Sequence, residues 1–174
     1  SNLEPVITDG DGNTYPLFFQ GDEHYYHNPD LTFEEEQTYA FSLMYNGKEV
    51  SAQTFVPTPP TGLTLSATSI GRTRILDFAD IQNQTIPDPF EATWTGDDGA
   101  FYFVEVTNIE TDPDIINELL ASFDRPPLPQ IQTEPSVDQT YRLDIRREIN
   151  YFGRHEIIVY RVNPEYVLLY QDPG

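Results

Sequence analysis

The chain contains no cysteine, and the residue types that it lacks exclude several classes of protein. Without cysteine there are no disulfide bonds, no thiolate metal sites and no cysteine nucleophile. This absence does not locate the protein, because a chain without thiols is compatible with reducing and oxidising compartments alike. No run approaches the roughly 18 apolar residues of a membrane-spanning helix, so we expect no direct insertion of this segment into a membrane.

Positive charge is also scarce. The 174 residues carry 29 acidic against 9 basic side chains, which gives a formal net charge of −20 at pH 7, and Lys48 is the only lysine. Nucleic acids and anionic lipid surfaces are bound through contacts of Lys and Arg with phosphates, so we expect neither as a partner. A strongly acidic surface keeps a protein soluble, which is the plainest interpretation of this charge.

The first third of the chain shows the two-residue periodicity of half-buried β-strands. In segment 38–45, large apolar residues occupy alternate positions and share one face. Asn46-Gly47 follows directly, and Asn-Gly is the strongest short signal for a hairpin, so we expect a second strand over 49–56. The Asp/Gly/Asn run at 9–13 predicts another hairpin near the N-terminus, because these residues tolerate positive φ.

Proline interrupts the chain after these strands. Residues 58–62 form a proline-rich linker, because proline removes a backbone donor and fixes φ. We therefore predict two β units, residues 1–57 and residues 63–174. The linker is short and stiff, which favours contact between the units, so we expect residues 1–57 not to fold independently.

The second unit is predicted to be mainly β with one short helix. Gly96–Gly99 lies between two strand patterns and predicts a third hairpin. A helix is expected over 114–123, with Asp112 as its cap, Pro113 at its first position and apolar residues at helical spacing. The strands are expected over 63–65, 72–78, 90–95, 100–107, 139–149 and 154–162.

Several of these segments resemble a known kind of domain. The run from Gln37 through Tyr45-Asn46-Gly47, with Ala52-Gln-Thr-Phe-Val-Pro57, resembles the last strands of a fibronectin type III or immunoglobulin-like domain. Residues 60–170 look like a second such domain, with Trp94 in its second strand. The order of the segments also looks like an uncharacterised family of predicted lipid-anchored surface proteins of Gram-negative bacteria.

This resemblance implies an all-β fold built from fibronectin type III or Ig-like antiparallel β-sandwich units, with one short helical insertion near 114–123. Tyr39 would be the corner tyrosine, buried and with its hydroxyl bonded to backbone near 34–37. Trp94 would fill the sandwich interior. The family also implies export to the cell surface or outer membrane by a lipid anchor outside this sequence. It brings no catalytic residue.

Oxygen ligands at calcium-loop spacing occur in the first turn. Asp9, Asp11 and Asn13 occupy the first, third and fifth positions of such a loop. The sixth position is Thr14 instead of glycine, and the twelfth is Gln20 instead of glutamate. A plain turn is therefore the preferred interpretation, and these three residues remain the candidates for a metal site.

Two histidines lie close together in an acidic stretch. His24 and His27 follow Asp22 and Glu23, which are residue types that bind metals. Residues three apart on a strand face opposite sides of a sheet, and Asn28-Pro29 disfavours a helix. We therefore expect neither a metal nor a cofactor here.

Aromatic residues are plentiful, with 11 Tyr and 11 Phe. Tyr25 and Tyr26 are adjacent and are candidates for a platform on which a sugar would stack. Adjacent residues on a strand point to opposite faces, so one exposed ring follows from the geometry alone.

The sequence shows no motif for catalysis. It has no Gly-x-Ser-x-Gly elbow, and carboxylate pairs such as Asp97 and Asp98 lie in predicted turns, with nothing in the sequence to mark a cleft around them. We expect a non-enzymatic cell-surface module for binding or assembly, whose partner is a protein or a glycan. The alternatives are a carbohydrate-binding module of a glycan-uptake system and a hydrolase with an unrecognised carboxylate site.

Overall fold

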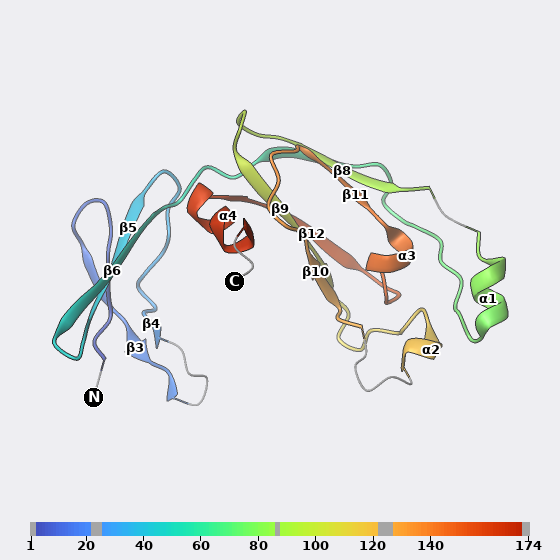
Figure 1. The fold of residues 1–174 in the computed structure, drawn as a ribbon, viewed down its shortest axis with the longest axis horizontal. Helices are drawn as coiled ribbons and strands as arrows, with labels where there is room; N and C mark the ends of the chain where they lie inside the picture. Colours follow the sequence, from blue (N-terminus) through green and yellow to red (C-terminus); the bar gives the residue numbers. More distant parts are fainter. Residues whose placement is uncertain (1–2, 22–25, 86–87, 122–126, 172–174) are drawn as a thin grey trace. The chain divides into compact units, whose positions relative to one another are not determined.

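The computed structural model describes residues 3–21, 26–85, 88–121 and 127–171 (Figure 1). The chain divides into two compact units, Ser1–Thr58 (unit 1) and Pro59–Gly174 (unit 2), and each is described by itself. Strands account for 42% and helices for 13% of the structure, and all sheets are antiparallel, which confirms the prediction of a mainly β protein.

Unit 1 contains one four-stranded sheet and one two-stranded sheet. The larger sheet has the order β2-β1-β5-β6, and β3 pairs with β4. The strands are β1 (Val6–Thr8), β2 (Thr14–Pro16), β3 (Phe18–Phe19), β4 (Tyr26–His27), β5 (Thr38–Tyr45) and β6 (Lys48–Phe55).

Both hairpins predicted in unit 1 are confirmed. Thr8 pairs with Thr14 across the first turn, and Tyr45 pairs with Lys48 across the second. Asn46 and Gly47 have φ values of 50° and 73°, the left-handed conformation that a two-residue hairpin turn requires at both central positions. Turn chemistry that is local in sequence therefore determines the register of both pairs.

The environment predicted for Tyr39 is also confirmed. The side chain is 4% exposed, and its hydroxyl accepts a hydrogen bond from the Glu34 amide at 2.8 Å and donates to the Thr32 carbonyl at 3.3 Å. Phe33 packs edge-on against the Tyr39 ring, with the ring centroids 4.8 Å apart. The tyrosine thus joins β5 to the segment that precedes it.

Unit 2 contains two three-stranded sheets, with the orders β11-β8-β7 and β10-β9-β12. The strands are β7 (Thr61–Leu65), β8 (Phe90–Thr95), β9 (Phe101–Asn108), β10 (Gln130–Gln132), β11 (Thr140–Leu143) and β12 (His155–Val162). The helices are α1 (Phe78–Asn83), α2 (Glu118–Ala121), α3 (Ile145–Glu148) and α4 (Pro164–Gln171). Within this unit, α1, α2 and α3 lie at one end and α4 at the other (Figure 1).

The two sheets of unit 2 share one apolar core. Alternate residues of β8 and of β9 are buried, as the period of two requires. Trp94 of β8 meets Tyr102 of β9 edge-on, with ring centroids 5.9 Å apart, so the predicted interior position of Trp94 is confirmed. The buried cluster consists of Phe90, Trp94, Tyr102, Val104, Val106, Leu143 and Ile145.

The hairpin predicted at Gly96–Gly99 is wrong. β8 pairs with β7 and β11, and β9 pairs with β10 and β12, so neither strand has an edge left for the other. The turn instead carries the chain from one sheet to the other. The Gln139 side chain holds it by accepting from the Gly96 amide and donating to the Gly96 carbonyl, both at 3.1 Å. A Cβ atom at Gly96 would collide with the Tyr102 ring, so glycine is required here.

The helix predicted over 114–123 is also wrong at its start. Only Glu118–Ala121 is helical, while residues 122 and 123 lie outside the described residues. The Ile116 amide donates to the Asn150 carbonyl at 2.9 Å, and the Ile116 carbonyl accepts from the Ile75 amide at 2.8 Å. These long-range bonds use the groups that a helix would need, and the predicted cap at Asp112 therefore starts no helix.

Two predicted strands of unit 2 are shorter than expected. Segment 72–78 forms no strand: its one β-bridge is the isolated bridge at Ile75, and Phe78 is the first residue of α1. The strand expected over 139–149 ends at Leu143, because the Asp144 side chain accepts a hydrogen bond from the Arg146 amide at 3.0 Å and caps α3. The eight-residue α4 was not predicted and is longer than α2, so the expectation of a single helical insertion is wrong as well.

Candidate functional site

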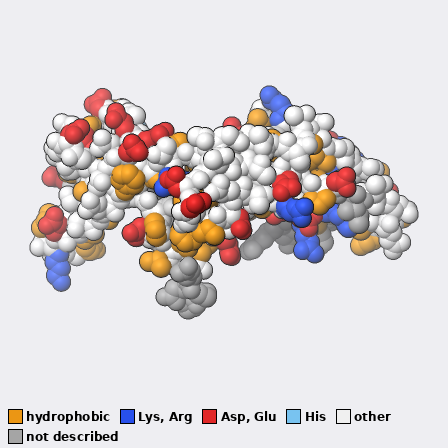
Figure 2. Space-filling view, turned by 90° about the horizontal axis from the view of Figure 1, so that it is seen from above, with side chains coloured by type: hydrophobic (Ala, Val, Ile, Leu, Met, Phe, Trp, Pro, Cys, Tyr) orange, Lys and Arg blue, Asp and Glu red, His pale blue; other side chains and the backbone are white. Residues whose placement is uncertain are grey.

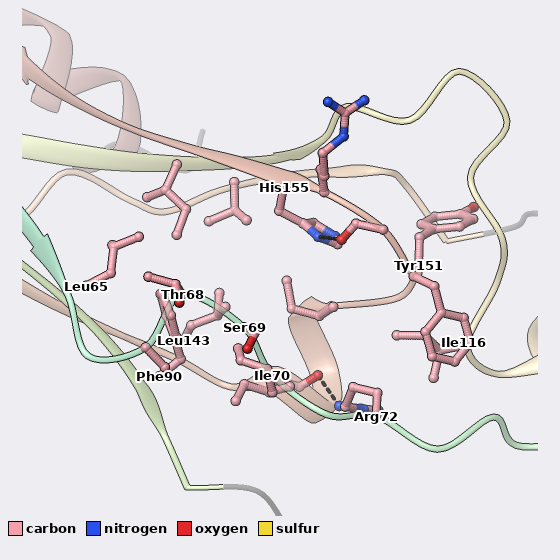
Figure 3. Close-up of a pocket in the computed structure, with 18 residues that line it drawn as sticks. Leu65, Thr68, Ser69, Ile70, Arg72, Phe90, Ile116, Leu143, Tyr151 and His155 are labelled. Carbon is pink, nitrogen blue, oxygen red and sulfur yellow. Dashed lines mark hydrogen bonds between the residues drawn. The ribbon is translucent and has the colours of Figure 1, made fainter.

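A cavity of about 350 Å³ lies between the sheets of unit 2, at the end that carries α3 (Figure 3). Both sheets contribute to its walls, and segments 67–72 and 149–155 close its sides. Apolar side chains dominate the lining, and the main ones are Leu65, Phe90, Val106, Leu143, Ile145 and Ile157. The volume lies within the range of about 300–1,000 Å³ that is usual for small-molecule sites.

The cavity exists because the strands at its edge end early. After β7, the Ser66 amide donates to the Glu91 carbonyl at 2.8 Å, and the chain then leaves the sheet. After β11, Asp144 starts α3, as described above. At this end β7 and β11 therefore no longer extend the sheet. Loop residues such as Ile70 and Ile149 form the cavity walls there instead.

Arg72 is the half-buried cation of the cavity wall. Its guanidinium donates a hydrogen bond to the Ile145 carbonyl (Figure 3). Burial lowers the pKa of Arg72, and the positive charge of Arg146 lowers it further, whereas Asp144 acts in the opposite direction. No carboxylate forms an ion pair with Arg72 among the described residues.

His155 lies at the start of β12 and faces the cavity (Figure 3). The Gly153 carbonyl, 3.2 Å from Nδ1, can only accept, so Nδ1 carries the hydrogen. In the neutral ring Nε2 is then an acceptor, and the Asn108 amide nitrogen donates to it at 3.3 Å. Burial lowers the pKa of His155 from 6.5, while Gly153 and Glu110 act in the opposite direction. Contacts at both ring nitrogens therefore fix the orientation of the ring.

Arg154 completes the polar side of the cavity. The Glu110 carboxylate accepts from both the amide of Arg154, at 2.8 Å, and its Nε atom, at 3.0 Å. These bonds lower the pKa of Glu110. Gly153 has a φ of 101°, and a Cβ there would also collide with Glu110, so glycine is required at this position of the loop.

A second, smaller cavity of about 120 Å³ adjoins the first. The two cavities share Arg72, Ile116 and Ile149 as lining residues. Arg146 lines the smaller one together with Gln84, whose Nε2 atom is buried and has no hydrogen-bond partner among the described residues.

Acidic side chains are missing from both linings among the described residues. The whole chain has 29 acidic residues, and acidic side chains are visible at many places on the face shown in Figure 2. Arg72, Arg146 and Arg154 line the cavities, which is three of the nine basic residues in the chain. Hydrolysis by paired carboxylates needs two such groups at a cleft, and these linings offer none. The described linings therefore offer apolar side chains and guanidinium groups, which can contact apolar and anionic groups respectively.

The residues predicted for calcium form a hydrogen-bonded turn. The Asp9 carboxylate accepts from the amides of Asp11 at 3.0 Å and Asn13 at 2.8 Å. It also accepts from the Asn13 side chain at 2.9 Å and the Tyr15 hydroxyl at 3.1 Å. The Asn13 side chain is the main cause of the lowered pKa of Asp9. No group of three or more His, Asp or Glu suited to a metal ion occurs among the described residues.

The aromatic candidates lie in unit 1, away from the cavity. Tyr26 is in β4 and packs against Phe19 with ring centroids 5.4 Å apart, and both line an open groove with Phe18. Phe18 and Phe19 are each 56% exposed. Tyr25 and His24 lie outside the described residues, and His27 is exposed.

Sequence reasoning missed the cavity and its charged residues. The sequence pattern predicts a strand at His155 but no role in a site, and it does not distinguish Arg72 and Arg146 from the other basic residues. Their positions in sequence are far apart, and only the scarcity of basic residues in so acidic a chain could have drawn attention to them.

No helix in the described part of the chain is long and apolar enough to span a membrane. In the comparisons with known proteins, no protein-family model matches the chain and no curated protein matches it, so the candidate site rests on its own geometry.

Proposed function

We propose that the chain is a non-enzymatic binding module of a bacterial cell surface, and that the 350 Å³ cavity of unit 2 is its binding site. The observation that carries this proposal is the contrast between lining and surface. A chain of net charge −20 surrounds a largely apolar cavity whose only charged lining residues, in the described part, are arginines. Such concave, mostly apolar sites with a few directed polar groups are typical of small-molecule binding.

The finer assignment of the fold supports the same role. Two antiparallel sheets that share a core, together with the Tyr39 hydroxyl bonded to backbone, agree with sandwich units of the fibronectin type III or Ig-like kind. Domains of this kind hold loops on a rigid scaffold, and the cavity lies where such loops meet. Display at the cell surface through a lipid anchor rests on the family resemblance alone, and protease accessibility on intact cells would test it.

Filling the cavity tests the proposed site. Ala67 is partly buried and lines the cavity, so Ala67→Phe places a ring inside it, whereas Ala79→Phe adds the same ring to exposed α1. We expect the wild-type chain to bind Nile red, an uncharged apolar dye, at one saturable site. Binding is expected to be lost in Ala67→Phe and retained in Ala79→Phe. Equal binding by the wild type and Ala67→Phe would show that this cavity is not the site.

A carbohydrate-binding module is the second candidate, and the exposed rings of unit 1 favour it. Phe18, Phe19 and Tyr26 border one groove, and aromatic faces of this kind can stack on sugar rings. Glycan-array binding that is lost in Phe18→Ala and Phe19→Ala but retained in Ala67→Phe would favour this function over the cavity.

A further inference from the structure

The smaller cavity of unit 2 is lined by hydrogen-bond donors. Arg72 and Arg146 border it, and Gln84 places a buried amide nitrogen there without a partner among the described residues. Asn117 and Asn150 are further polar residues of the lining. A buried donor without an acceptor costs free energy, so this wall is suited to a ligand that brings acceptor atoms.

Two like charges share this wall. Arg146 contributes to the lowered pKa of Arg72, so the two guanidinium groups repel each other. Asp144 offsets this in part, but its carboxylate already accepts from the Arg146 amide at 3.0 Å and lies 3.5 Å from the Arg147 side chain. An anion beside Arg72 and Arg146 would turn the repulsion into two attractions and give Gln84 an acceptor.

The donor-rich cavity and the apolar cavity meet at shared residues. Arg72, Ile116 and Ile149 line both, so an anionic group held at Arg72 is adjacent to the apolar space. Building on the proposed binding function, we infer that unit 2 binds an amphipathic carboxylate. Its anionic group contacts Arg72 and Arg146, and its apolar chain fills the larger cavity.

The size of the larger cavity limits the apolar chain. At roughly 30 Å³ for each carbon group, close to the volume of one liquid water, 350 Å³ holds about twelve carbons, enough for a ten-carbon chain. The net charge of −20 opposes the approach of any anion over long range. Both halves of the ligand therefore contribute to binding, because the apolar chain supplies affinity and the two arginines favour the charged end.

Titration calorimetry of the full chain at low ionic strength tests this inference, with decanoate, 1-decanol and inorganic phosphate as probes. We expect decanoate to bind about tenfold more tightly than decanol, as charge-assisted hydrogen bonds allow. Arg146→Gln should remove this advantage and leave decanol binding unchanged. Arg147→Gln is the matched control, because Arg147 is the next residue of α3, is 87% exposed and lines neither cavity.

Arg72 requires a conservative variant, because it also donates to the Ile145 carbonyl. Arg72→Lys keeps the charge but loses the planar guanidinium with its paired donors. We therefore expect it to weaken decanoate binding by about fivefold without affecting decanol binding. Thermal melts of each variant, followed by the single tryptophan, Trp94, show that unit 2 remains folded.

Each unfavourable outcome has a distinct meaning. If decanol binds as tightly as decanoate, the anion site is wrong and the apolar binding site stands. If phosphate alone binds as tightly as decanoate and Ala67→Phe leaves its binding unchanged, the ligand is a small anion and the amphipathic ligand is wrong. If neither decanoate nor decanol binds the wild-type chain, the inference fails. If Nile red does not bind the wild-type chain either, the proposed cavity function is refuted as well.

Discussion

The two units of this chain use the same kind of strand in different ways. In unit 2, β8 and β9 bury every second residue, and two sheets share a core of aromatic and branched side chains. In unit 1, β6 is exposed along its whole length, and Tyr39 is the one large side chain that is buried among the described residues.

Unit 1 relies on hydrogen bonds where unit 2 relies on apolar burial. The Asn28 side chain is buried, donates to the Pro16 carbonyl at 2.7 Å and accepts from the Asp30 amide at 2.8 Å. Each such bond stabilises by only about 1 kcal/mol net, whereas one buried Leu or Phe contributes roughly 1.5–3 kcal/mol. Ordered turns can therefore define a sheet without supplying much of its stability.

The largest expected effect is a difference in cooperative unfolding between the two units when each is expressed alone. Residues 59–174 expressed alone are expected to unfold in one cooperative denaturant transition, followed by Trp94 fluorescence, because they contain their own core. Residues 1–58 alone are expected to show no cooperative transition, because they bury too little apolar surface. Dispersed amide resonances and cooperative melting of the shorter fragment would contradict the comparison.

A core substitution gives the next largest effect. Leu143 is 3% exposed, so we expect Leu143→Ala to lower the free energy of unfolding of unit 2 by about 2–5 kcal/mol. Leu63→Ala in the same sheet is the control, because Leu63 is 42% exposed and its loss should cost less than about 1 kcal/mol. Urea titrations followed by Trp94 fluorescence measure the free energy of unfolding of both variants. Equal losses of stability in the two variants would show that Leu143 is not part of the core.

A smaller effect is expected from Tyr39 of unit 1, the corner tyrosine of the proposed Ig-like unit. Tyr39→Phe removes the hydroxyl that joins Glu34 and Thr32, so it should cost about 1 kcal/mol, the net value of one buried hydrogen bond. Tyr45 is 55% exposed, and Tyr45→Phe should change little. Amide resonances of unit 1 followed through a denaturant titration report this difference. An unchanged midpoint for Tyr39→Phe would argue against the corner interpretation.

The smallest predicted effect concerns pH. Burial lowers the pKa of His155 below 6.5, so the unfolded chain binds a proton that the folded chain resists. Stability of unit 2 should therefore fall as the pH drops below about 6.5, and it should fall less steeply in His155→Gln. His27→Gln, in exposed β4 of unit 1, is the control. Urea midpoints from Trp94 fluorescence between about pH 5 and 8 measure the slopes, and parallel slopes for the wild type and His155→Gln would contradict this assignment.

Features determined by neighbouring residues could be predicted from the sequence. The Asn46-Gly47 turn fixes its own backbone conformation, and the alternation of β5 follows from the pleat. The same pattern does not determine how strongly a strand is buried, because the segment that covers it lies elsewhere in the chain.

Features determined by distant residues could not be predicted. The segment around Ile116 has a helical apolar pattern, yet its backbone bonds to Ile75 and Asn150. Gly96–Gly99 has the composition of a hairpin turn, yet the neighbouring strands are already paired on both edges. The candidate site depends on such long-range packing, since its arginines are brought together only by the loops that close the sheets.

The turn at Gly96–Gly99 also has a consequence for the speed of folding. Because it joins two sheets, β8 and β9 do not pair by closing this short turn, and β9 completes its pairing only with β12, where Phe101 pairs with Val162. Local hairpins such as β5–β6 form in roughly 1–10 μs, whereas domains dominated by distant pairings fold over roughly milliseconds to seconds. On the ribosome, the second edge of β9 has no partner strand until synthesis reaches β12, so a nascent chain exposes that edge to chaperones until that point.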